Sequence, residues 1–246
     1  MKLLFIFSFL TCYSFHQIDG QETSNQLPVF TLSFRTLALE KGEYADMYIQ
    51  SDSEDEPTPV FFNRYRRSGS VSYTGTSPLV FFKMEKAPDP EIPPRRIPVA
   101  VFNITESTPR SDLLLLMRPN PSTEPNQPEF LVSEMDDSRE AFPQNSVIYI
   151  NLTSLDLVGT VNKKRADFPR GVSQPFSLTP TLNTAILYDN EQDIHFLFEN
   201  SFEFQKDSRV LLVLQPPKRR GSLRIRCRHI VDSSRPVPTP TPVPVD

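Results

Sequence analysis

Two matching stretches decide the predicted fold: Ser111-Asp-Leu-Leu-Leu-Leu-Met-Arg-Pro119 and Ser208-Arg-Val-Leu-Leu-Val-Leu-Gln-Pro216. Each consists of a polar pair, five apolar residues, one polar residue and a proline. An apolar run of this length is typical of a buried strand. Each stretch is followed by a polar loop, another strand and an Asp-Ser pair, at Asp137-Ser138 and Asp232-Ser233. The match indicates an internal duplication, or else the ordinary likeness of two buried strands.

A weaker match lies upstream of these stretches. Leu32-Ser-Phe-Arg-Thr-Leu37 resembles Ile148-Tyr-Ile-Asn-Leu-Thr153 in its pattern of apolar and polar residues. The spacing between matching segments varies along the chain, so the connecting loops must differ in length. The predicted repeating unit is a β-sandwich of about 100 residues.

Short strands are predicted along most of the remaining chain, separated by turn residues every 8–12 positions or so. The 246 residues include 25 prolines and only 7 glycines, and closely spaced prolines leave little room for long helices. The best helical candidate is Asp136–Phe142, with Asp137 or Ser138 as its cap and Pro143 at its end. Val60–Tyr65 and Ile194–Glu199 are among the predicted strands.

We therefore predict an all-β protein with two immunoglobulin-like β-sandwich modules. The first module is expected at residues 27–135 and the second at 144–233, with a short helical turn at 136–143 between them. Residues 234–246 are rich in proline and predicted to be an extended, disordered tail. That tail is either a spacer or a segment that docks onto a partner.

The first residues have the pattern of a secretory signal peptide. Lys2 precedes an apolar run that ends near Leu10 and is too short to cross a bilayer. We expect residues 1–20 to be removed after Gly20, although Ser14 offers another cleavage site. Lipidation of Cys12, or an uncleaved anchor, is the alternative. The longest later apolar run has five residues, so no transmembrane segment is expected in the mature chain, which is predicted to be secreted or periplasmic.

The cysteines predict a protein without a disulfide. Cys12 falls within the predicted signal peptide and leaves Cys227 alone, which a domain of this size tolerates because its core stabilises it. Cys227 and His229 would share a strand face, but a zinc site needs three or four ligands. A buried, inert thiol is the favoured interpretation. No glycine-rich phosphate-binding loop occurs, and no cofactor is expected.

No catalytic arrangement is recognisable. His195 is predicted to face solvent, opposite an inward face of Ile194, Phe196 and Phe198, and His229 is predicted to be partly buried. No Gly-x-Ser-x-Gly motif offers a nucleophile. We therefore expect a protein that is not an enzyme. The alternative is an exported hydrolase of envelope carbohydrate, whose dispersed carboxylates one sequence cannot bring together.

Two acidic runs are predicted to be solvated turns: Asp52–Glu56, and the group Glu134, Asp136 and Asp137. Calcium takes oxygen ligands from such clusters and is the alternative, but neither run has the glycine-punctuated spacing of a calcium loop. The tripeptides Asn103-Ile-Thr105 and Asn151-Leu-Thr153 are glycosylation sequons, which matter only in a eukaryotic secretory pathway.

The most concrete surface feature is basic, with six cationic residues in an eleven-residue segment. A hairpin turn is predicted at Lys218–Gly221, and the following arginines alternate with apolar residues, so they are expected to line one exposed strand face. Guanidinium groups in a row suit an anionic envelope polymer; the alternative is a solvated face that protects a sheet edge. No aromatic residues interleave with them, so nucleic acid is not an expected partner. The candidate anion-binding residues are Lys218, Arg219, Arg220, Arg224, Arg226 and Arg228.

The stretch Asp136-Asp-Ser-Arg-Glu-Ala-Phe-Pro-Gln-Asn-Ser-Val-Ile-Tyr-Ile-Asn-Leu-Thr153 resembles a signature of a family of uncharacterised secreted bacterial β-rich proteins. Asp207–Leu214 is similar to that family's closing strand. Other members often have Trp before the closing strands, where this chain has Phe202 or Phe204. The resemblance implies a bacterial cell-envelope protein with two β-rich halves, and it carries over no activity and no functional residue. The expected function is that of a non-catalytic structural or binding module.

Overall fold

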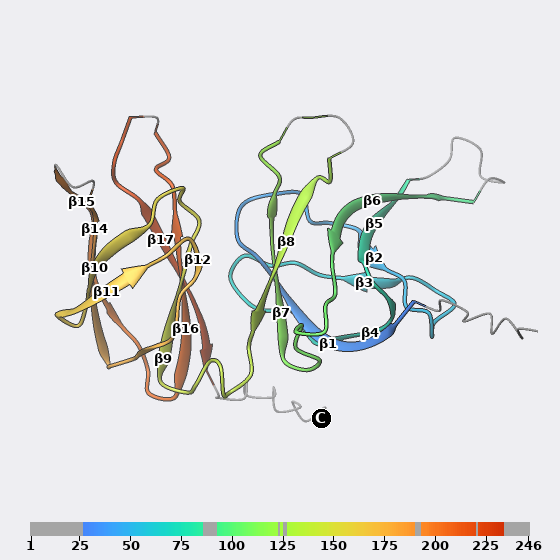
Figure 1. Ribbon diagram of the computed structural model, residues 1–246, viewed down its shortest axis with the longest axis horizontal. Helices are drawn as coiled ribbons and strands as arrows, with labels where there is room; N and C mark the ends of the chain where they lie inside the picture. The colour runs from blue at the N-terminus through green and yellow to red at the C-terminus, as the bar shows by residue number, and fades with distance from the viewer. Residues whose placement is uncertain are drawn as a thin grey trace, which may run out of the picture.

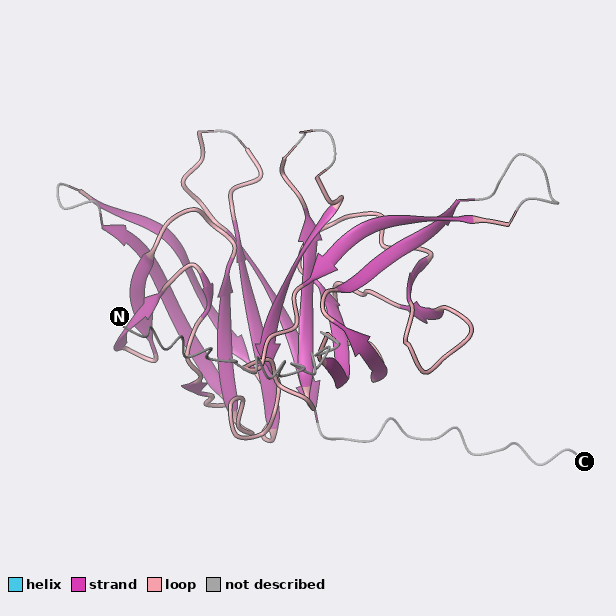
Figure 2. Cartoon of the chain, turned by 45° about the vertical axis from the view of Figure 1, so that its right-hand side comes forward, coloured by secondary structure: helices cyan, strands magenta, loops and turns pink. Residues whose placement is uncertain are grey.

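The computed structural model describes residues 27–85, 93–122, 124, 127–189, 193–219 and 221–233. The predicted signal peptide with Cys12, the proline-rich tail and Arg220 lie outside these residues. All regular structure in the described part is β-strand, arranged in four sheets (Figure 2). The all-β prediction is therefore confirmed. The described residues include no helix of the length and apolarity that a membrane crossing needs.

The first module is a sandwich of two four-stranded sheets. Its outer sheet has the order β3-β2-β5-β6, and its inner sheet has the order β4-β1-β7-β8. The strands are β1 (Val29–Ala38), β2 (Met47–Ile49), β3 (Thr58–Val60), β4 (Val71–Thr76), β5 (Leu79–Glu85), β6 (Arg95–Phe102), β7 (Leu113–Pro119) and β8 (Phe130–Asp136).

The second module is built in the same way. Its outer sheet has the order β11-β10-β14-β15, and its inner sheet has the order β12-β9-β16-β17, with β13 also paired to β9. The strands are β9 (Ser146–Asn151), β10 (Leu157–Val161), β11 (Lys164–Phe168), β12 (Gly171–Val172), β13 (Phe176–Ser177), β14 (Thr181–Asp189), β15 (Ile194–Glu203), β16 (Ser208–Gln215) and β17 (Arg226–Ser233).

Strand order and strand direction coincide in the two modules. The first strand of each is parallel to one of the apolar strands quoted above, β1 to β7 and β9 to β16, and the other pairs are antiparallel. Phe34 pairs with Leu113, and Val147 pairs with Val210. Because Leu113 and Val210 occupy the same place in the two stretches quoted above, Phe34 of the first module corresponds to Val147 of the second. The predicted match of Leu32 with Ile148 is wrong, because it equates a residue of the first module's core with one that faces away from the second module's core.

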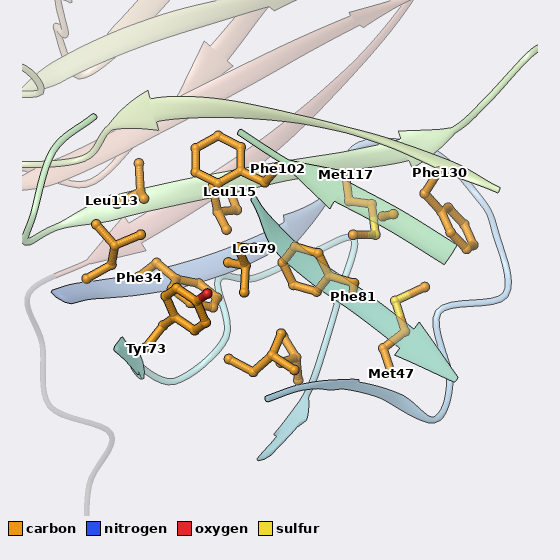
Figure 3. Packing of buried hydrophobic residues seen from close by; sticks show 14 of the residues in the cluster. Phe34, Met47, Tyr73, Leu79, Phe81, Phe102, Leu113, Leu115, Met117 and Phe130 are labelled. Carbon is orange, nitrogen blue, oxygen red and sulfur yellow. The ribbon is translucent and has the colours of Figure 1, made fainter. Parts of the chain in front are cut away.

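The inner sheets of the two modules pack face to face, so the molecule has four layers (Figure 1). Strand β7 places Leu113, Leu115 and Met117 in the core of the first module, shown in Figure 3. It places Leu114 and Leu116 between the modules. Strand β16 divides its apolar residues in the same alternating way. The five central residues of each strand are apolar because both faces of the run are buried.

The connection between the modules is a single turn. The Phe142 N–H donates to the Ser138 carbonyl (2.8 Å), which is the bond of one α-helical turn. The Ser138 hydroxyl accepts from the Ala141 N–H (3.2 Å), so Ser138 caps the turn as one of the two predicted candidates. Pro143 follows directly and, together with the short span, prevents a longer helix.

The predicted strand at Val60–Tyr65 is wrong beyond its first residue. Strand β3 ends at Val60, and residues 61–70 form a loop along the edge of β1. The Ala38 N–H donates to the Asn63 carbonyl, and the Ser68 N–H donates to the Thr36 carbonyl, each at 3.0 Å. These bonds satisfy the part of β1 that β4 does not cover. They also bring the run Arg64-Tyr-Arg-Arg67 to the boundary between the modules.

The predicted faces of β15 are wrong at Ile194, Phe196 and Leu197, whereas Phe198 packs against the core of the second module as predicted. Leu197 is buried in the core, whereas Ile194 and Phe196 are 69% and 55% exposed. The pairing of β15 with β14 shifts between Ile186 and Leu187, and this bulge breaks the strict alternation on which the prediction relied. His195 is half-buried and its ring stacks on Tyr188.

Candidate functional site

The apolar boundary between the inner sheets, called the seam below, is built from matching positions of the two modules. On the first module Leu114 of β7 pairs with Met135 of β8, and on the second Leu211 of β16 pairs with Ile230 of β17. All four side chains are buried there. The buried seam residues are Leu37, Leu39, Leu114, Leu116, Met135, Phe142, Ile148, Ile150, Leu211, Val213 and Ile230.

Asp137 closes one end of the seam with a buried ion cluster. Its side chain is 0% exposed and contacts three guanidinium groups, those of Arg35 (2.6 Å), Arg67 (2.9 Å) and Arg209 (3.5 Å). Arg35 and Arg67 come from the first module and Arg209 from the second. The prediction of a solvated turn at Asp137 is wrong, because its buried carboxylate accepts hydrogen bonds from Arg35 and Arg67 and forms an ion pair with Arg209. For the same reason it offers no oxygen to calcium.

Asp232, the acidic residue of the second Asp-Ser pair, belongs to the same cluster. Its carboxylate accepts a hydrogen bond from Arg209 (2.6 Å) and lies 3.7 Å from Arg67. Partial burial by itself raises the pKa of Asp232. The Arg209 hydrogen bond and the neighbouring positive charges outweigh that effect and lower the pKa below its ordinary value. Asp232 is therefore held ionised and is unsuited to donate a proton.

The ring of Phe142 completes the charged end. Phe142 is fully buried, and the guanidinium groups of Arg67 and Arg209 lie 5.7 and 5.0 Å from its ring centroid. Arg209 also donates to the Asp137 carbonyl (2.7 Å). A polar hollow of about 620 Å³ opens beside this cluster, and Ser33, Asp112 and Arg139 are among its further lining residues. Because arginines neutralise Asp137 and Asp232, neither of these two carboxylates is suited to act as a general acid, and the cluster links the two modules.

The predicted anion-binding residues divide into two groups. Lys218, Arg219, Arg224 and Arg226 are exposed, and Arg220 lies outside the described residues. Arg228 instead turns into the contact between the modules, where it donates to the carbonyls of Ala38 (3.3 Å) and Leu39 (2.8 Å).

The expectation of an uninterrupted exposed row is therefore wrong at Arg228. The face of β17 that carries Arg226, Arg228 and Ile230 is the face that packs against the first module. Arg226 is the first residue of β17 and is exposed. Arg224 precedes β17, which begins at Arg226.

Arg228 meets Arg64 at the side of the seam. The two guanidinium carbons lie 6.0 and 5.8 Å from the ring centroid of Tyr65. Three buried nitrogens, Nε and Nη1 of Arg228 and Nε of Arg64, have no hydrogen-bond partner within the described part of the chain. Burial lowers the pKa of Arg228, and the positive charge of Arg64 lowers it further. Two positively charged guanidinium groups are thus held near the same ring, and three of their N–H groups have no hydrogen-bond partner within the described residues.

An aromatic groove of about 780 Å³ begins at Arg64 and Tyr65 and continues over the first module. Phe61 and Tyr65 are 72% and 69% exposed. Large exposed apolar side chains gathered at a hollow are typical of a contact surface. The other lining residues are Gly42, Glu43, Tyr44, Ala45, Asp46, Met47, Tyr48, Pro59, Val60, Phe62 and Asn63.

Cys227 agrees with the prediction of an inert thiol. It packs against the core of the second module, and burial raises the pKa of the thiol to about 12. His229, predicted to be partly buried, is exposed and contacts the rings of Phe202 and Phe204. Within the described ranges, no group of three or more His, Cys, Asp and Glu side chains is placed to hold a metal ion.

The remaining candidates separate clearly by burial. Asp52–Glu56 is an exposed turn, as predicted. Asn103 is exposed. Asn151 is buried, and its amide nitrogen donates to the carbonyls of Leu155 and Phe168, each at 2.9 Å. The Asn151 sequon therefore serves as an internal hydrogen-bonding element in the folded protein.

Sequence reasoning missed Arg35, Arg64 and Arg67. The one available signal is the run Arg64-Tyr-Arg-Arg67 directly after Phe61-Phe62, which places cations beside aromatic residues in a loop.

No protein-family model matches this chain, and a search of the curated proteins gives no match. The resemblance to a family of secreted bacterial proteins therefore stays a prediction, as does the hydrolase alternative.

Proposed function

We propose that the protein is an exported, non-catalytic binding or structural module of the cell envelope, in which two β-sandwiches act as one rigid body. The observation that carries this proposal is the seam. It combines a shared apolar core with a buried ion cluster contributed by both modules. Two modules that moved independently on a flexible linker would need neither a shared apolar core nor a shared ion cluster. Such a body presents surfaces of both modules at a fixed separation, which suits a scaffold or a receptor for an extended ligand.

The two modules, in this proposal, arose by duplication of one immunoglobulin-like sandwich. Their common strand order and directions support this origin. So do the matching roles of Leu114 with Leu211 and of Asp137 with Asp232 around the seam. The contact between inner sheets then resembles a twofold homodimer interface, in which the same patch of each subunit meets its copy.

The proposed partner is an anionic polymer of the envelope. Lys218, Arg219, Arg224 and Arg226 are exposed and form no salt bridge with any described residue. Unpaired cations close together on one hairpin suit a polyanion better than they suit a packed protein interface.

A binding screen tests the proposed function. The mature protein is titrated with envelope polysaccharides and with the insoluble envelope fraction, together with a Lys218/Arg219/Arg224/Arg226→Ser variant. Arg228 is left intact because it bonds to the first module. Wild type is expected to bind a polyanion, and the variant is expected to bind more weakly with a shallower salt dependence. Absence of any wild-type binding, or turnover of a carbohydrate by wild type, would contradict the proposal.

A further inference from the structure

The aromatic groove has one cationic end. Arg64 lines it, and Arg228 lies beside Arg64 with Tyr65 in contact with both guanidinium groups. Arg228 also shares its strand face with the exposed Arg226, so the basic row leads from solvent toward this end of the groove.

The arginine pair has no carboxylate bound to it within the described part of the chain. Neither guanidinium forms a salt bridge to a described residue, and three of their buried nitrogens donate to nothing there. The facing titratable groups are Tyr44, Tyr65 and Glu40. Tyr44 stays protonated, because burial first and then the charge of Glu40 raise its pKa to about 12. An oxyanion at Arg64 would relieve the repulsion between the two arginines.

The rest of the groove is suited to a ligand that is mostly uncharged. Phe61 and Tyr65 offer exposed rings, against which the C–H faces of sugar rings pack. Glu43 and Asp46 line the groove and are exposed, so their carboxylates can accept hydrogen bonds from hydroxyl groups. The same two carboxylates repel a polymer with a charge on every unit close to the wall, such as a nucleic acid or a polyphosphate.

We propose that this groove binds an acidic polysaccharide, with sugar rings against Phe61 and Tyr65 and a uronic-acid carboxylate against Arg64 backed by Arg228. This inference rests on the proposed function and specifies its ligand class and the place where the ligand is held. The exposed cations of the β16–β17 hairpin then attract the polymer, and the groove selects it.

Calorimetric titration of the full mature protein with a hyaluronan oligosaccharide, in which each uronic acid alternates with an uncharged sugar, tests the proposal. Dextran is the neutral probe and dextran sulfate the densely charged one. The variants are Arg64→Gln, which removes the positive charge, and Tyr65→Ala, which removes the exposed ring. The matched control is Arg66→Gln, an exposed arginine of the same loop that is absent from the groove lining. Circular dichroism of each variant confirms that the fold is retained.

We expect wild type to bind the hyaluronan oligosaccharide, with affinity reduced about tenfold or more by Arg64→Gln. Tyr65→Ala should weaken binding similarly, and Arg66→Gln should change it less than twofold. Dextran should bind weakly. If Arg64→Gln and Arg66→Gln bind like wild type, or if dextran sulfate is strongly preferred, the groove assignment fails while the proposed function stands. If wild type binds none of these polymers and nothing in the envelope screen, both fail together.

Discussion

At the scale of single residues, Asp137 takes part in three ion pairs, more than any other described residue. Its buried carboxylate is surrounded by arginines from both modules, and each of its oxygens accepts at least one hydrogen bond. A buried ion pair contributes little net stability by itself, but removal of one member leaves the others uncompensated in a dry environment.

Replacement of Asp137 by Asn is therefore expected to destabilise the protein by about 3–5 kcal/mol. The variant keeps the size of the side chain while three guanidinium groups lose their shared counter-charge. Urea denaturation followed by circular dichroism measures the loss. The neighbouring Asp136→Asn is the control, because Asp136 is exposed, and it should change stability by less than about 0.5 kcal/mol. Equal stabilities of the two variants would show that the cluster does not support the fold.

Asp232 gives the cluster a predictable response to acid. Its pKa is lowered in the folded protein, so its contribution is fully present above the unfolded-state pKa, about 3.9. That contribution is lost as the pH falls through the lower folded-state value. The free energy of unfolding of wild type should therefore drop below about pH 4 more steeply than that of Asp232→Asn. Asp156→Asn, at an exposed surface pair, should follow the wild-type curve. Parallel curves for wild type and Asp232→Asn would refute the assignment.

Some of the cluster's residues can be predicted from the sequence and others cannot. The repeated Asp-Ser pairs single out Asp137 and Asp232 by their pattern alone. Their partner Arg67 lies 70 residues from Asp137 along the chain and reaches it through a loop whose path no local pattern specifies. Alternation correctly placed Arg226 and Arg228 on one strand face. It could not say that this face meets another module, because that depends on tertiary packing.

At the scale of elements, the loop at residues 61–70 shows how a sheet edge recruits irregular chain. The preference of Val60-Phe-Phe62 for strand suggested a longer strand than β3. Instead the loop turns to bond with the uncovered edge of β1, because unpaired backbone groups there would be buried without partners. The burial demands of β1 therefore override local propensity, and the arginines of the loop reach the seam as a result.

Gly159 lies where two strands of the outer sheet of the second module, β10 and β14, approach each other closely. A Cβ atom at this position would lie 2.0 Å from the Ala185 carbonyl oxygen of β14. Gly159→Ala is expected to force β10 and β14 apart and to destabilise the protein by about 1–3 kcal/mol. Gly69→Ala is the matched control, since an added Cβ there meets nothing within 4 Å. Thermal unfolding compares the two, and a stable Gly159→Ala protein would contradict this packing.

At the scale of the whole molecule, the seam makes the protein one body. Strands β7 and β16 each contribute apolar side chains to their own module's core and to the shared boundary. Their unbroken apolar runs predicted buried strands, and in the structure both faces of each run are buried. The sequence did not reveal what covers the second face, since a strand between two sheets of one domain would have the same composition. The two modules are therefore coupled through this boundary.

Native-state hydrogen exchange of wild type and Leu116→Ala, read by mass spectrometry, tests that coupling most directly. Leu116 lies in the first module and is buried in the seam, and its truncation should cost about 2–5 kcal/mol. If the modules open as one unit, amides of β7 and of β16 should lose protection by the same free energy, although only β7 carries the substitution. Loss of protection in β7 with β16 unchanged would rule out this coupling, because it would mean that the two modules open independently.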